Sequence, residues 1–261
     1  MSAKKDNAVQ RLKTLMDDPG QALVIHYSRQ NLSDNERGMA TPRIIAIMVK
    51  SLDGVTTNCF AIHHEAEKAK ITLENITDYY DLLEERLLIS FTNFVKANPG
   101  RKWIHWDMND VHFSFEAIEH RYKVLVDEAG EGFVQVPNKD RVNLNQMIKA
   151  IYGSNYEIEP QLDNLMRTNN KGHLVADFLS LPEEALSFKQ LAFPAILESL
   201  RAKVNFLLDV IEKTANESLK VGKRNRINRL KSFITHPITA TISLFLTLAS
   251  LIIKIIGLLG K

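Results

Sequence analysis

The chain has 261 residues, of which 45% are hydrophobic and 25% are charged, and it contains one cysteine. This composition is that of a folded protein with enough chain to bury a core, so collagen-like, disulfide-rich and wholly disordered classes are excluded. The net charge of +2 is the sum of two unlike parts. Residues 1–219 carry 25 basic and 31 acidic side chains, a net charge of −6, whereas residues 220–261 carry eight basic side chains and no acidic one.

The predicted elements of the acidic part alternate between helices and strands. Compact apolar or β-branched runs predict strands at residues 22–28, 43–52, 55–63 and 102–106. Asp53-Gly54, between the second and third of these runs, is a strong signal for a two-residue hairpin turn. Apolar residues at three- and four-residue steps predict helices at residues 5–17, 72–97, 109–126, 143–152 and 160–168, with two more across 173–219.

This order of elements is that of the opening of the ribonuclease H-like architecture. VIHYSRQNL followed by RIIAIMVKSLDG, the stretch from LLISFTNF to HRYKVL, and NLNQMIKAIYG resemble the DEDD-type 3′→5′ exonucleases in order and spacing over about residues 22–180. The resemblance implies an α/β, ribonuclease H-like domain over residues 21–181. An N-terminal helix at 1–20 is then expected before it, and a helical extension at 182–219 after it.

The first two catalytic motifs of that family are altered in this chain. The family holds two divalent ions with four carboxylates, which clamp the attacking and leaving oxygens of a phosphodiester. Where the first strand of the family carries Asp-x-Glu, this chain has His26 and Ser28. In the second motif, His105 and Asp110 fall on the expected His and Asp, but Trp106 replaces Asn.

The last motif of the family is His followed by Asp five residues on, and here His173 and Asp177 are four residues apart. The favoured interpretation is a degenerate exonuclease fold without its metals. The alternative is a remodelled site in which His26, Asp107, Asp110 and His112 bind a softer ion such as Mn²⁺ or Zn²⁺. The catalytic candidates, if the domain is active with Mg²⁺ or Mn²⁺, are His26, Asp107, Asp110, His173 and Asp177. A buried, hydrogen-bonded core histidine is the simpler explanation for the first of these.

An apolar segment ends the chain. Residues 238–259 contain one charged side chain, Lys254, and a helix of this length crosses a hydrocarbon core of about 30 Å. The ammonium of Lys254 lies near enough to the end of the segment to reach the far interface. We therefore expect a single transmembrane anchor over residues 236–261. A buried helix of the soluble fold is the alternative.

A basic juxtamembrane segment is expected over residues 220–235. Its six basic residues are Lys220, Lys223, Arg224, Arg226, Arg229 and Lys231. Basic residues beside a span stay in the cytoplasm and favour anionic lipid, so the body is expected in the cytoplasm at the inner membrane. The same run is also compatible with binding to nucleic acid. Residues 1–18 are polar and charged, so no signal peptide is expected.

These features favour a membrane-anchored cytoplasmic sensor or effector with a catalytically degenerate domain. The arrangement is similar to the effectors of bacterial antiviral defence that join a soluble domain to a membrane segment, which implies output through the transmembrane helix. The expected partners are membrane lipid and a cytoplasmic protein or a second copy of the chain. Two alternatives remain: a membrane-tethered, metal-dependent nuclease with atypical ligands, and a membrane scaffold for a cytoplasmic partner. The net charge of −6 argues against simple nucleic-acid binding by the body.

Overall fold

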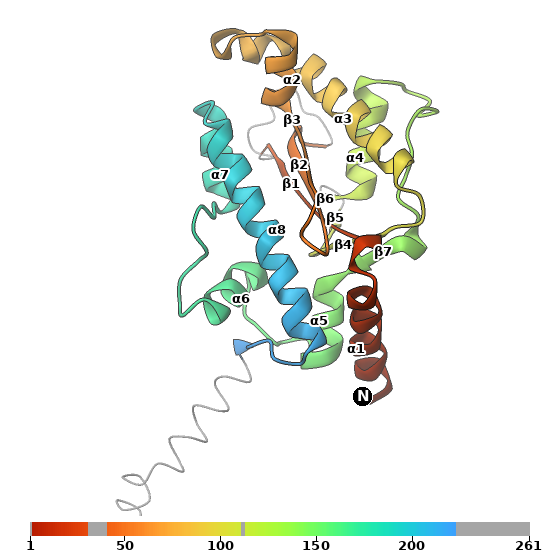
Figure 1. Ribbon diagram of the computed structural model, residues 1–261. Coiled ribbons are helices and arrows are strands. Elements are labelled where there is room, and N and C mark those ends of the chain that lie inside the picture. The colour runs from red at the N-terminus through yellow and green to blue at the C-terminus, as the bar shows by residue number, and fades with distance from the viewer. Residues whose placement is uncertain (1, 31–40, 111–112, 223–261) are drawn as a thin grey trace, which may run out of the picture.

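Five strands form a mixed sheet at the centre of the molecule (Figure 1). The computed structural model describes residues 2–30, 41–110 and 113–222. The strands of the sheet are β1 (Ala22–Arg29), β2 (Ile44–Ser51), β3 (Thr57–Ala61), β4 (Lys102–His105) and β7 (Arg141–Asn143). Their order across the sheet is β3-β2-β1-β4-β7. The α/β class expected from the sequence is therefore confirmed, with β1 in the middle.

Four of the five strands, β1, β3, β4 and β7, run in the same direction, and β2 runs opposite to them. β1 pairs in parallel with β4, with Ile25 opposite His105, and β4 pairs in parallel with β7, with His105 opposite Asn143. β2 is antiparallel to β1 and to β3. The carboxyl ends of β1, β4 and β7 consequently meet at one edge of the sheet, where open α/β sheets bind their ligands.

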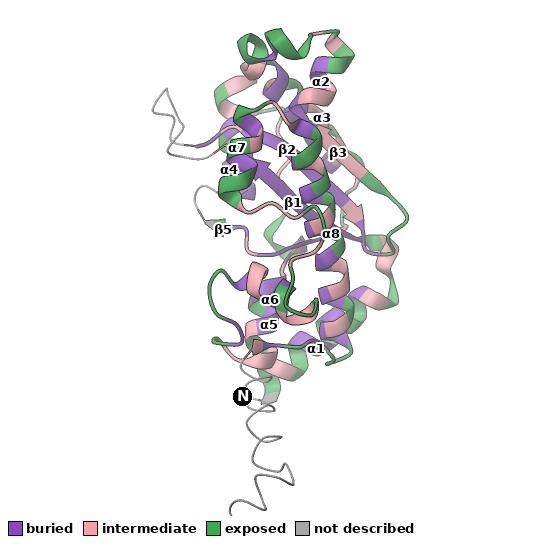
Figure 2. Cartoon of the chain, turned by 90° about the vertical axis from the view of Figure 1, so that its left-hand side faces the viewer, coloured by how far each residue is buried: buried purple, intermediate pink, exposed green. Residues whose placement is uncertain are grey.

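Hydrophobic layers cover both faces of the sheet, which explains why β1 is a continuous apolar run. On one face, Leu23 and Ile25 of β1 share a cluster with side chains of α3 (Tyr80–Ala97) and α4 (Phe115–Leu125). On the other face, Val24 shares a cluster with side chains of α1 (Ser2–Asp17), α5 (Leu144–Tyr152) and α8 (Phe193–Ala215). Figure 2 shows that β1 and β2 are buried over almost their whole length. Strands buried on both faces are expected to be apolar throughout.

The remaining elements are short. The helices are α2 (Ile62–Ala69), α6 (Gln161–Asn169) and α7 (Leu181–Lys189), and the 3₁₀ turns are η1 (Pro19–Gln21), η3 (Leu73–Tyr79) and η4 (Asn138–Asp140). A second, two-stranded sheet consists of β5 (Asn109–Asp110) and β6 (Phe113–Ser114).

Several predicted elements are confirmed with small shifts at their ends. The helix predicted at 5–17 is α1, and the strands predicted at 22–28, 43–52 and 102–106 are β1, β2 and β4. The hairpin between β2 and β3 turns at Asp53-Gly54, where Gly54 has a φ of 77°, which glycine adopts without steric cost. The helix predicted at 72–97 is present as η3 followed by α3.

Three details of the prediction are wrong. The helix predicted from residue 109 begins only at Phe115, because residues 109–114 contain β5 and β6, and the hydroxyl of Ser114 caps α4 by accepting from the amide of Ala117 at 3.0 Å. The strand predicted at 55–63 ends at Ala61, since Ile62 already begins α2. The strand β7 was not predicted, because a three-residue strand has no periodicity to detect.

Both terminal helical segments of the body contribute to the core. Leu12 of α1 and Leu200 and Leu207 of α8 are fully buried in the same cluster as the sheet residue Val24. The helical residues expected as an extension at 182–219 therefore form part of the layer that covers the sheet.

No helix within the described ranges 2–30, 41–110 and 113–222 is long and apolar enough to cross a membrane. The expected anchor over 236–261 lies outside those ranges. So do Lys254 and the basic residues Lys223, Arg224, Arg226, Arg229 and Lys231.

Candidate functional site

The face of β1 that packs toward α8 carries the two residues that replace the expected carboxylates. His26 is 9% exposed, and its Nδ1 atom has no hydrogen-bond partner among the described residues. Burial, with a smaller contribution from the charge of Lys203, lowers the pKa of His26 from 6.5 to about 3. The imidazole is therefore neutral at physiological pH.

Ser28, two residues further along β1, belongs to a buried polar network. Its hydroxyl donates to Glu184 Oε2 on α7 at 2.8 Å. The other carboxylate oxygen, Oε1, accepts from the Ser199 hydroxyl at 3.0 Å and from the Lys203 ammonium at 2.6 Å, both on α8. Glu184 and Lys203 are 3% and 5% exposed. The central strand, α7 and α8 are thus joined through one carboxylate.

This network brings a cation of the protein itself to the central strand. The Lys203 ammonium also lies 4.8 Å from the centre of the Phe178 ring, an arrangement in which the ring face attracts a positive charge. An ammonium and a divalent ion in the same buried space repel each other, and the Glu184 carboxylate is already paired with Lys203. The face of β1 that carries His26 and Ser28 therefore meets a buried ion pair between α7 and α8.

Asp107 follows the end of β4 and is surrounded by amide groups. Its carboxylate accepts from the side-chain amides of Asn109 at 2.6 Å, Asn143 at 3.0 Å and Asn145 at 2.9 Å. Asn145 is almost fully buried and also accepts from the Tyr156 hydroxyl at 2.8 Å. The arrangement fixes the carboxyl ends of β4 and β7 relative to α5, and the donors that Asp107 accepts from are neutral.

The other predicted residues are dispersed. Asp110 lies on β5, paired in register with Phe113, and His112 lies outside the described residues. His173 and Asp177 are exposed on the loop between α6 and α7, whereas His26 is buried. Within residues 2–30, 41–110 and 113–222, no group of three or more His, Cys, Asp or Glu side chains could hold a metal ion.

His105, at the end of β4, shapes the local turn. Its Nδ1 atom accepts a hydrogen bond from the backbone amide of Met108 at 2.9 Å, and its ring meets the edge of Phe115 at 5.8 Å between centroids. Burial lowers the pKa of His105 from 6.5 to about 4. The histidine that matches the second family motif is thus a neutral, buried residue at the carboxyl edge of the sheet.

Glu184, Ser199 and Lys203 were not predicted from the sequence. A signal for the last two exists in the chain: they are four residues apart and interrupt the buried face of α8, which is otherwise lined by Ile196, Leu200, Val204 and Leu207. Polar residues on the buried face of a helix need partners, because an unpaired buried polar group is costly. Glu184 had no such local signal.

Comparison with known proteins gave no match, whether the chain was compared with protein-family models, with curated proteins or with solved structures.

Proposed function

We propose that this protein is a membrane-anchored sensor or effector whose ribonuclease H-like domain has lost metal-dependent catalysis. The order of three strands with a hairpin, helices, a fourth strand and a further helix supports the ribonuclease H-like part of the proposal. The observation that carries the loss of catalysis is the network of Ser28, Glu184 and Lys203 on the central strand. It supplies one carboxylate where four are needed, and it fills the space beside it with an ammonium.

A second observation supports coupling between the domain and the C-terminal segment. Leu219 and Val221 are 1% exposed, so the chain stays packed on the body beyond the end of α8. The side chain of Asn169 bonds both the amide and the carbonyl of Lys220, at 3.2 and 2.9 Å. The amide of Gly222 donates to Glu157 Oε2 at 2.9 Å. The basic run therefore starts from a point that is fixed on the domain.

In the proposed arrangement, the acidic body lies in the cytoplasm, the basic run contacts anionic lipid, and residues 236–261 anchor the chain. A change in the body is transmitted through this fixed junction to the membrane segment, whose self-association produces the output. Membrane lipid and a second copy of the chain, or a cytoplasmic protein, are then the partners.

The anchor is tested by cell fractionation of the full chain and of a chain that ends at Gly222. We expect the full chain in the membrane fraction and the shortened chain outside it. The Lys254→Leu variant tests the output separately from the anchor. It should remain in the membrane fraction, and the change in membrane potential that its expression causes should differ from the change caused by the unaltered chain. Equal distribution of the full and shortened chains would overturn the anchor.

The loss of catalysis is tested by incubating the purified chain with single-stranded DNA or RNA and with Mg²⁺ or Mn²⁺. We expect no cleavage. Cleavage that disappears in the Asp107→Ala or Asp110→Ala variant would instead establish a metal-dependent nuclease with atypical ligands. A stoichiometric copurified protein, without cleavage or a change in potential, would establish the scaffold alternative.

A further inference from the structure

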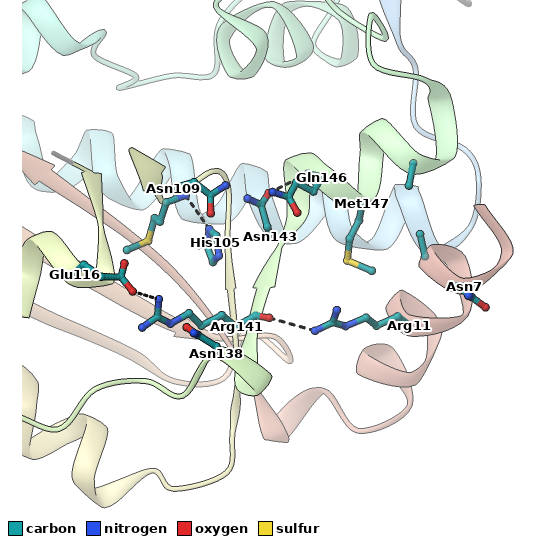
Figure 3. A pocket seen from close by; sticks show the side chains of 13 residues that line it. Asn7, Arg11, His105, Asn109, Glu116, Asn138, Arg141, Asn143, Gln146 and Met147 are labelled. Carbon is teal, nitrogen blue, oxygen red and sulfur yellow. Dashed lines mark hydrogen bonds and ion pairs between the residues drawn. The ribbon is translucent and has the colours of Figure 1, made fainter. Parts of the chain in front are cut away.

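A cavity of about 590 Å³ lies at the carboxyl ends of β4 and β7, beside α1 and α5 (Figure 3). This volume is within the range of about 300–1,000 Å³ that is typical of pockets for small molecules and cofactors. The cavity does not include the network of Ser28. His105, which lines it, is opposite Ile25 in the sheet, so it points to the other face from His26.

His105 supplies a buried donor to this cavity. It is 3% exposed, and its Nδ1 atom is occupied as an acceptor for the Met108 amide. Because the ring is neutral, its single proton is on Nε2, which acts as a donor. No residue in the described ranges accepts a hydrogen bond from Nε2. Figure 3 shows the ring between Asn143 and Arg141.

Among the described residues, two guanidinium groups, of Arg11 and Arg141, line the cavity, but only one carboxylate, of Glu116. The guanidinium of Arg141 already has partners in the protein. It donates to Glu116 at 2.5 Å and to the carbonyl of Val136 at 2.9 Å, and it lies 4.6 Å from the centre of the Phe115 ring. Arg11 of α1 donates one bond, to the carbonyl of Arg141 at 3.2 Å, and pairs with no carboxylate of the described residues. Its remaining N–H groups are therefore available for an anion.

Amide side chains with unused hydrogen-bonding capacity also line the cavity. Asn7 of α1, Asn138 of η4 and Gln146 of α5 line the cavity, and their side chains bond no described residue. An amide side chain both donates and accepts, which suits it to the edge of a nucleobase. Small and flexible apolar side chains of α1 and α5 complete the lining: Ala8, Met147 and Ala150.

We propose that this cavity binds a nucleoside monophosphate. The phosphate accepts from Arg11 and from Nε2 of His105, the base lies against the apolar side chains of α1 and α5, and the amide of Gln146 bonds the edge of the base. A simple anion would leave most of the cavity unfilled, and an apolar ligand would leave its polar lining unpaired. The proposal is independent of the membrane anchor and of the absence of catalysis.

Calorimetric titration of the full chain in detergent with AMP and with UMP tests the proposal. Inorganic phosphate and adenosine are titrated in parallel, and we expect each to bind at least about tenfold more weakly than the nucleotide that contains both parts. The Arg11→Gln variant should bind the nucleotide about tenfold to a hundredfold more weakly, because it loses charge-assisted hydrogen bonds. Arg86→Gln, which alters an exposed arginine on α3 outside the cavity, should leave the affinity unchanged.

Arg11 is exposed, so its replacement is expected to preserve the fold, and a thermal unfolding curve without ligand checks this. The Gln146→Ala variant gives a second readout: it should weaken binding of AMP or UMP while leaving the weak binding of phosphate unchanged. Absence of saturable binding by either nucleotide at millimolar concentration would overturn the proposal. Equal affinities in the Arg11→Gln and unaltered chains, or phosphate binding as tight as that of AMP, would do so too.

Discussion

The ammonium of Lys203 on α8 donates a hydrogen bond to Glu184 Oε1 on α7, at 2.6 Å, and both side chains are buried. Each charge is desolvated, so the pair is stable only while both partners are present. The hydroxyls of Ser28 and Ser199 donate two further hydrogen bonds to the same carboxylate. The ion pair and its two hydroxyl donors therefore connect the central strand β1 with the helices α7 and α8.

Replacing Lys203 by Met should reduce the free energy of unfolding by about 3–5 kcal/mol, because it leaves the Glu184 carboxylate buried and unpaired. The double variant Lys203→Met with Glu184→Gln should recover a large part of that loss, since no isolated charge remains. Urea unfolding of the chain measures both. Lys213→Met is the matched control on the same helix: its pair with Asp209 is about 40% exposed, so the loss should be below about 1 kcal/mol. Similar losses in the two single variants would contradict the role assigned to Lys203.

The stability of the protein should fall as the pH is lowered from 6.5. The folded-state pKa of His26 is about 3, below its ordinary value of 6.5, so the unfolded chain binds a proton that the folded chain excludes. The contribution of His26 to the free energy of unfolding is complete above pH 6.5. It decreases by about 1.4 kcal/mol for each pH unit below that value, down to the folded-state pKa. His105 and His63, both lowered to about 4, act in the same direction.

The His26→Gln variant should therefore show a shallower dependence of unfolding free energy on pH between 6.5 and about 4. Denaturant titrations at several pH values measure this slope. His173→Gln serves as the control, because His173 is exposed in the folded chain and exposed again when it unfolds. A slope that is the same in the His26→Gln and unaltered chains would show that His26 is protonated in the folded state.

The amide groups around Asp107 should stabilise the edge of the sheet. Asn145→Leu removes the donor to Asp107 and Gln161 and the acceptor for Tyr156, so we expect a loss of about 1–3 kcal/mol in the free energy of unfolding. Gln10→Ala, an exposed change on α1, should alter stability by no more than about 0.5 kcal/mol. Equal stability of the Asn145→Leu and unaltered chains would mean that solvent replaces these hydrogen bonds.

An element of the fold can be predicted from the sequence when residues close to it in the chain determine it. The apolar run of β1, the Asp53-Gly54 turn and the four-residue spacing of Leu83, Leu87 and Phe91 on α3 act over a few residues, and each led to a correct element. The strand β7 exists because it pairs with β4, which no local pattern reveals.

The same distinction applies to the candidate sites. The sequence resemblance located His26 and Ser28, because the position of a residue on a strand can be read from its neighbours. It could not locate Glu184, which is 156 residues from Ser28 along the chain and meets it only because α7 packs beside β1. The cavity of Arg11 and His105 likewise depends on the packing of α1 against α5, which is a tertiary contact.

The junction between the body and the C-terminal segment should loosen when Asn169 is replaced by Ala, because its side chain holds both backbone groups of Lys220. We expect the amide of Lys220 to exchange hydrogen about tenfold faster, which corresponds to about 1.4 kcal/mol of local stability. Asn170→Ala is the matched control, since the side chain of Asn170 bonds the carbonyl of Leu174 and not the junction. Membrane output should fall in the Asn169→Ala variant and persist in the control if the fixed junction transmits the signal. Faster exchange without any change in membrane output would show that the output does not depend on the rigidity of this junction.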